Sequence, residues 1–149
     1  MESVVMEFKM PMDVVAIQKA IPHRYPFLFI DRVLEVKPFE SLIAIRNITI
    51  SDPALQGHFP GNPIVPGVVI IEGAAQAAAV LGRISKGTLT ECLFTEISEA
   101  RFRKPVLPGD VLKYNIKLTK HRGAFLWFEA DMTVDSTEVS FVKFSALMK

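Results

Sequence analysis

His58 and Glu72 are the two residues of this sequence whose types and surroundings best suit proton transfer. A histidine exchanges a proton near neutral pH, and the Gly and Pro residues around His58 fix its loop and let a ligand approach the backbone. Glu72 lies in an alanine-rich segment, where burial would raise its pKa, as a proton donor requires. Taken singly, His58 can instead brace a loop, and Glu72 can be a structural carboxylate held by a neighbouring cation or amide. Together they are the candidates for an acid–base pair.

Three further residues are candidates because of their places beside this pair. Gln76 lies one helical turn after Glu72, on the same helix face, where it can hydrogen-bond the carboxyl group and orient it. Gly67 opens the same helix, and its free N–H at the positive end of the helix dipole can polarise a carbonyl oxygen. Phe59, next to His58, is assigned with them to substrate binding. A purely structural Gln76 and a helix start that binds nothing are the alternatives.

The helix that must carry these groups is predicted over residues 66–82. Pro66 suits a first helical turn and Gly82 a C-terminal stop, which gives roughly 25 Å of helix. The segment is apolar nearly all round, so it should be buried nearly all round. Glu72 and Gln76 interrupt it, which favours a buried soluble helix over a membrane span. Small residues would let a sheet approach it closely: Gly73, Ala74, Ala75, Ala77, Ala78 and Ala79.

The rest of the chain predicts a sheet around that helix. Residues 13–20 form a short helix capped by Asp13, and residues 51–66, with four prolines and two glycines, form a stiff loop. Period-two alternation marks strands at 112–119 and 126–135. A hairpin precedes the loop and an apolar strand ends the chain, at residues 27–36, 42–50 and 139–148. The inventory is an α+β fold of about six mostly antiparallel strands around one buried helix.

Composition narrows the function classes. The 149 residues suit one domain over residues 1–149, and a net charge of +1 argues against a general nucleic-acid binder. The single cysteine, Cys92, excludes an internal disulfide and suits a small buried residue in a reducing cytosol. No export signal is visible, so we expect a cytoplasmic protein. The histidines lack metal-ligand spacing and no nucleotide-binding motif is present, so we expect neither metal nor cofactor.

Residues 101–122 form the one segment of uneven charge, with seven basic side chains against the single acid Asp110. Such a surface suits an acidic partner. A solvated hairpin face is the alternative. Arg103 and Lys104, just before the turn at 105–109, are our candidates for docking the partner.

Three segments of the sequence resemble the FabZ-type hydroxyacyl-acyl-carrier-protein dehydratases. Residues 57–67 read GHFPGNPIVPG, and with Glu72 and Gln76 they match the family's long and specific GHFPxxPxxPG…E…Q pattern. IPHRYPFL at 21–28 and FRKPVLPGD at 102–110 resemble its N-terminal and downstream signatures. The resemblance covers residues 13–135, and the last strand matches more loosely.

The resemblance implies a hot-dog fold, in which an antiparallel sheet wraps around a long central helix, and homodimers that commonly form hexamers as trimers of dimers. It implies an apolar tunnel for the acyl chain and a site where His58 faces Glu72 of the partner subunit. The substrate would be a (3R)-3-hydroxyacyl thioester on the phosphopantetheine of acyl carrier protein, in fatty-acid and lipid A synthesis. His58 would take the C2 proton, Glu72 would protonate the departing 3-hydroxyl, and the Gly67 N–H would hold the thioester oxygen.

Two other functions fit parts of this pattern. A thioesterase on the same fold can use an acidic residue of the central helix to direct water, and fold alone does not exclude it. A non-catalytic acyl-carrier or lipid-binding module would keep the basic segment but would not need His58 and Glu72. The pairing of these two residues favours dehydration. Glutamate at position 72, where the related dehydratase–isomerases carry aspartate, favours dehydration without isomerisation.

Overall fold

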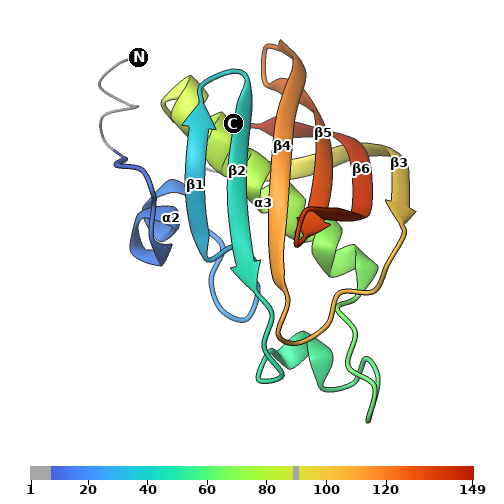
Figure 1. The fold of residues 1–149 in the computed structure, drawn as a ribbon. Helices are drawn as coiled ribbons and strands as arrows, with labels where there is room; N and C mark the ends of the chain where they lie inside the picture. Colours follow the sequence, from blue (N-terminus) through green and yellow to red (C-terminus); the bar gives the residue numbers. More distant parts are fainter. Residues whose placement is uncertain (1–7, 89–90) are drawn as a thin grey trace.

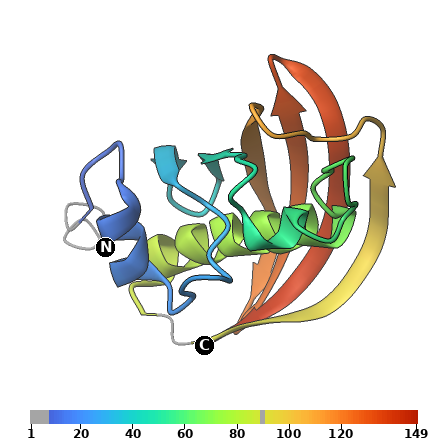
Figure 2. The same cartoon turned by 90° about the horizontal axis from the view of Figure 1, so that it is seen from below.

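The fold is a six-stranded antiparallel sheet that curves around one long helix, as Figures 1 and 2 show. It is seen in a computed structural model that describes residues 8–88 and 91–149. The helices are α2 (Val14–Ala20), the short 3-10 helix η1 (Pro53–Leu55) and the central α3 (Gly67–Lys86). In sheet order the strands are β1 (Arg32–Lys37), β2 (Ser41–Asn47), β4 (Val111–Arg122), β5 (Phe125–Val134), β6 (Thr137–Met148) and β3 (Cys92–Phe102). The α+β hot-dog fold expected from the sequence is confirmed.

The short helix and the period-two strands form where the sequence predicts them. The Asp13 carboxylate accepts the Ala16 N–H at 2.9 Å and caps α2. Every second side chain is buried from Leu112 to Leu118 on β4 and from Leu126 to Met132 on β5, because one face of the sheet packs on the core and the other is wet. The first hairpin is shorter than predicted, since β1 begins at Arg32 and not at residue 27.

The central helix is longer than predicted, and Gly82 does not end it. The helix continues to Lys86 and ends at Gly87, whose φ of 86° lies in the left-handed region that glycine favours. Gly82 is small for a different reason: a Cβ there would lie 2.5 Å from the Met148 sulfur. The helix is long and apolar enough to cross a membrane by length and composition, but most of it is buried here as a core helix.

The small residues of α3 let the sheet approach the helix closely, as expected. A Cβ on Gly73 would lie 2.2 Å from the Tyr114 hydroxyl oxygen, so only glycine lets β4 come this close. The buried Tyr114 hydroxyl donates to the Phe29 carbonyl at 3.2 Å, which joins β4 to the segment before β1. The helix, the sheet and that segment therefore pack at one point.

The strand that the sequence does not assign to a range is β3, at the edge of the sheet beside β6. Most of its side chains are exposed on both faces, including the apolar Leu93, Ile97 and Phe102. Its outer edge has no partner strand within the described chain. A long exposed apolar edge is unusual in a monomer and is open to pairing with another chain.

Candidate active site

A short, self-bonded loop carries His58. The His58 Nδ1 lies 2.8 Å from the Ile64 carbonyl, and the Ile64 N–H donates back to the His58 carbonyl at 2.8 Å. Phe59 and Asn62 exchange two backbone hydrogen bonds of 2.9 and 2.8 Å. Because a carbonyl only accepts, Nδ1 is the donor in this contact, and in the neutral ring Nε2 is then the nitrogen with the lone pair. His58 is thus held in the tautomer of a general base.

His58 lines a cavity of about 490 Å³ at the start of α3. Gly67, Arg103 and Lys104 line the same cavity, so the structure brings these four predicted site residues together. The Gly67 N–H has no backbone acceptor among the described residues, and Phe102 lies so close that a Cβ on Gly67 would be 2.6 Å from its ring. The cavity therefore offers a base, a free N–H donor and two cations at one place.

Phe59 stacks on the His58 ring, with centroids 4.1 Å apart and an angle of 27° between the planes. Its side chain is 51% exposed and does not line the cavity. In the chain it contacts the base, and its apolar surface remains open to a ligand.

Glu72 does not line this cavity, and its side chain on α3 is only partly buried. Its Oε2 accepts the Gln76 Nε2–H at 3.0 Å, the i to i+4 contact predicted from the sequence. Burial raises the pKa of the Glu72 carboxyl, and the hydrogen bond from Gln76 opposes this effect only in part. The environment therefore favours the protonated acid.

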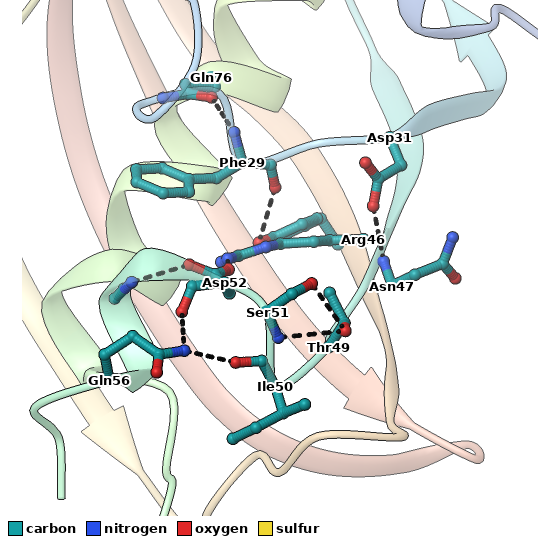
Figure 3. A network of polar contacts seen from close by, with 12 residues as sticks. Phe29, Asp31, Arg46, Asn47, Thr49, Ile50, Ser51, Asp52, Gln56 and Gln76 are labelled. Atoms are coloured by element: carbon teal, nitrogen blue, oxygen red, sulfur yellow. Dashed lines mark hydrogen bonds and ion pairs between the residues drawn. The ribbon is translucent and has the colours of Figure 1, made fainter.

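Gln76 is buried and uses both ends of its amide inside the chain. Its Oε1 accepts the Phe29 N–H at 2.8 Å, and its Nε2 donates to the Phe27 carbonyl at 2.9 Å as well as to Glu72. Figure 3 shows the contact with Phe29. The amide holds the segment before β1 against α3 and fixes the Glu72 carboxyl. Because Gln76 is only 1% exposed, it has almost no surface with which to contact a substrate.

The same segment is tied to the loop that leads to His58. The Arg46 guanidinium lies 4.9 Å from the Phe29 ring centroid and pairs with Asp52. Figure 3 labels these three residues in the same network. Asp52 in turn caps η1 by accepting the Ala54 N–H at 2.9 Å. The amide of Gln56 donates to the carbonyls of Ile50 and Asp52. This network supports both catalytic candidates from one part of the core.

His23 is a residue near Glu72 to which sequence reasoning gave no chemical role. Its Nε2 lies 3.8 Å from the Glu72 Oε2, and its Nδ1 is buried without a hydrogen-bond partner. Burial, followed by the charge of Arg24, lowers the pKa of His23. Arg24 braces the end of α2, because it donates to the carbonyls of Gln18 and Ile21. His23 and Glu72 lie far apart in the sequence, so no local spacing links them. Only the IPHRYPFL signature, of which His23 is a member, pointed to this residue.

The remaining reactive groups have ordinary roles. Burial, followed by the charge of Glu72, raises the pKa of the Cys92 thiol to about 12, so the thiol stays protonated and is a poor nucleophile. Among residues 8–88 and 91–149, no group of three or more His, Cys, Asp or Glu side chains is placed to hold a metal ion.

Several basic residues of the segment 101–122 lie beside acidic residues in the structure, so the segment carries less uncompensated positive charge than its sequence indicates. Arg103 pairs with Glu138 at 2.7 Å, and Arg101 pairs with Glu99 at 2.9 Å. Lys117 stands opposite Glu129 in the β4–β5 ladder. Lys104 has no ion pair among the described residues and is exposed beside the cavity. Uncompensated positive charge at the cavity is therefore concentrated on Lys104.

Comparisons with known proteins show the family to which the chain belongs. Residues 21–143 match the FabA-like domain family. The 3-hydroxyacyl-[acyl-carrier-protein] dehydratase FabZ of Sulfurimonas denitrificans is 48% identical and is matched over 93% of this chain and 98% of its own length. The protein of the same name from Campylobacter concisus is 44% identical, over 91% and 97%. The dehydratase heterocomplex ApeI:P from Xenorhabdus doucetiae shares the fold, with a TM-score of 0.78, 18% identity and coverage of 89% and 90%. The chain therefore belongs to the FabA-like family and, within it, to the FabZ-type dehydratases.

Proposed function

We propose that this chain dehydrates (3R)-3-hydroxyacyl thioesters on acyl carrier protein to trans-2-enoyl thioesters, in cytoplasmic fatty-acid and lipid A synthesis. The observation that carries the proposal is the 2.8 Å contact between the His58 Nδ1 and the Ile64 carbonyl. This contact commits Nδ1 to the carbonyl, which leaves Nε2 as a proton acceptor on a residue of the cavity. Glu72, whose pKa is raised by burial, supplies the matching acid.

The reaction needs only these groups and takes place at the C2 and C3 carbons of the substrate. The Gly67 N–H binds the thioester oxygen and makes the C2 proton more acidic. The His58 Nε2 takes that proton, the electron pair forms the C2–C3 double bond, and the C3–O bond breaks. Glu72 gives its proton to the departing hydroxyl, which leaves as water. Transfer of the proton from His58 back to Glu72 through solvent then restores the starting state.

The active site is shared between two copies of the chain in this proposal. His58 lies with Gly67 at the cavity, whereas Glu72 lies outside it with Gln76 and His23. A second copy that pairs along the exposed edge of β3 would cover its apolar side chains and bring the Glu72 of each chain to the cavity of the other. We extend the assembly to a hexamer, as a trimer of such dimers.

Lys104 and Arg103 dock the acidic carrier protein at the mouth of this cavity. Both line it, and phosphopantetheine delivered there would reach His58 and Gly67. Complementary charge steers such an encounter and is screened by salt. Because Arg103 is engaged by Glu138, Lys104 is the main contributor.

The test is an assay of the purified chain with 3-hydroxyacyl thioesters of several chain lengths, which follows enoyl formation and free thiol release separately. We expect enoyl formation without thiol release. His58→Ala and Glu72→Gln should each lower turnover by at least about 100-fold, the scale of a lost general base or acid, while circular dichroism shows an intact fold. Thiol release in place of enoyl formation would identify a thioesterase, and near-wild-type turnover of either variant would remove that residue from the mechanism.

A further inference from the structure

The imidazole of His23 lies beside the proposed acid, Glu72, and the proposed reaction gives it no role. Its Nε2 is 3.8 Å from the Glu72 Oε2. This is too long for a hydrogen bond, but a movement of roughly 1 Å would make one. We propose that His23 is a positioning residue for Glu72, whose Nε2–H hydrogen-bonds the carboxylate as the proton leaves it. The inference rests on the proposed function, because it assigns Glu72 the role of acid.

The surroundings of the ring favour the tautomer that this role needs. The Nδ1 of His23 is buried and has no hydrogen-bond partner. An N–H buried without an acceptor costs free energy, and a nitrogen lone pair in the same place is the lesser cost because the second ring nitrogen can then donate. The proton is therefore placed on Nε2, the atom that faces Glu72.

Burial and the charge of Arg24 shift both partners of this contact toward their neutral forms. The Glu72 carboxyl contacts Gln76 on its own helix and His23 from the loop after α2, and its charge acts on the Cys92 thiol of β3. Arg24 adjoins His23 and opposes a positive charge on its ring. A neutral imidazole does not pull the proton from the acid in the ground state, but it donates to the carboxylate that forms in the transition state.

The test compares three variants of the full-length assembled protein. His23→Leu removes the donor, His23→Gln keeps an N–H at a similar reach, and His121→Leu is a matched control on the exposed part of β4. We expect His23→Leu to lower kcat on the order of 10- to 100-fold with little change in KM, as for one hydrogen bond to developing charge. His23→Gln should recover most of the loss, and His121→Leu should match the wild type.

Two further readouts separate a positioning role from a structural one. Activity is lost at high pH as Glu72 ionises, and removal of a donor to the carboxylate raises the pKa of Glu72. The basic limb of the kcat/KM profile should therefore move to higher pH in His23→Leu and stay in place in His23→Gln. On a Glu72→Gln background, His23→Leu should cause no additional loss, because the two residues act as a unit.

Several outcomes would overturn the inference. A folded His23→Leu variant with wild-type kcat and an unmoved basic limb would do so, as would an equal loss on the Glu72→Gln background. If His23→Leu does not fold, His23→Asn, whose side chain is too short to reach Glu72, takes its place against His23→Gln. Wild-type turnover in Glu72→Gln alone would instead overturn the proposed function, so the two failures are distinguishable.

Discussion

Burial acts in opposite directions on the two titratable groups that meet at Glu72. It raises the pKa of the Glu72 carboxyl and lowers the pKa of the His23 ring, because in each case it disfavours the charged form. Both shifts act toward the uncharged pair, a carboxylic acid beside a neutral imidazole, which is the direction that a proton donor needs. His58 differs, because its role is set by a hydrogen bond to the Ile64 carbonyl that fixes its tautomer. The two catalytic candidates are therefore tuned by different physical means.

A raised pKa at Glu72 predicts a cost in stability that a neutral side chain would remove. The folded state favours the protonated carboxyl. The stability that this preference provides is fully present below the pKa of the unfolded chain, and it is lost as pH rises through the higher pKa of the folded chain. Glu72→Gln should therefore raise the free energy of unfolding at pH 8, with a smaller gain at pH 4. Urea unfolding at fixed protein concentration measures it.

Glu40→Gln is the control for this prediction, since Glu40 is an exposed carboxylate in the β1–β2 turn. It should change stability little at either pH. A Glu72→Gln variant that is less stable than the wild type at pH 8 would show that the ionised carboxylate is well paired in the fold.

Elements buried on one face were predictable from the sequence, and those defined by tertiary contacts were not. The alternation in β4 and β5 reports their packing on α3, so both strands were found. The strand β3 exposes both faces in this chain and has no such alternation, so its range was missed. Gly82 was misread as a helix end because a close contact with Met148 and a left-handed cap both select glycine.

The same distinction between local pattern and tertiary contact applies to the residues of the candidate site. The residues of the GHFPxxPxxPG…E…Q pattern were found from sequence, and the Glu72–Gln76 contact followed from helical spacing. The contact of His23 with Glu72 joins the segment after α2 to α3 and is invisible to local pattern. The same holds for Glu138, whose pairing with Arg103 reduces the positive charge that residues 101–122 present in sequence.

The packing of α3 on the sheet predicts a contrast between its two tight glycines. In Gly73→Ala the new Cβ would lie 2.2 Å from the rigid, fully buried Tyr114 hydroxyl, so Tyr114 must shift and lose its bond to Phe29. We expect a loss of about 1–3 kcal/mol. In Gly82→Ala the neighbour is the flexible Met148 side chain, and the gain in helix propensity of up to about 1 kcal/mol offsets the crowding.

Thermal unfolding of the two variants, side by side, measures this contrast. Equal losses would mean that the backbone of α3 can move away from β4 as easily as Met148 can rotate. Tyr114→Phe in the Gly73→Ala background should recover part of the loss, because the closest atom is then removed.

At the scale of the whole molecule, the charge beside the cavity predicts a substrate-dependent effect. Lys104→Glu should raise KM for carrier-protein substrates severalfold and weaken their salt dependence, because the encounter loses its complementary charge. It should leave turnover of a short coenzyme A or pantetheine thioester unchanged, since His58 and Glu72 are untouched. Lys19→Glu, an exposed reversal on α2, is the control. Equal loss with both substrates would assign Lys104 to the site or the fold, and no loss with either would move docking elsewhere.

The separation of His58 from Glu72 in one chain predicts that two inactive variants can restore each other. His58→Ala and Glu72→Gln chains, unfolded together and refolded or exchanged under verified mixing, should form mixed dimers with one intact site and one doubly altered site. Under random exchange half of the dimers are mixed and each has one of two sites, so activity should approach about a quarter of wild type. The mixing is measured by tagging one variant, and the activity by enoyl formation. Each variant refolded alone is the control and should stay inactive. If verified mixed dimers show no recovery, both groups act within one subunit, and the cavity at the start of α3 would have to reach Glu72 by a rearrangement of its own chain.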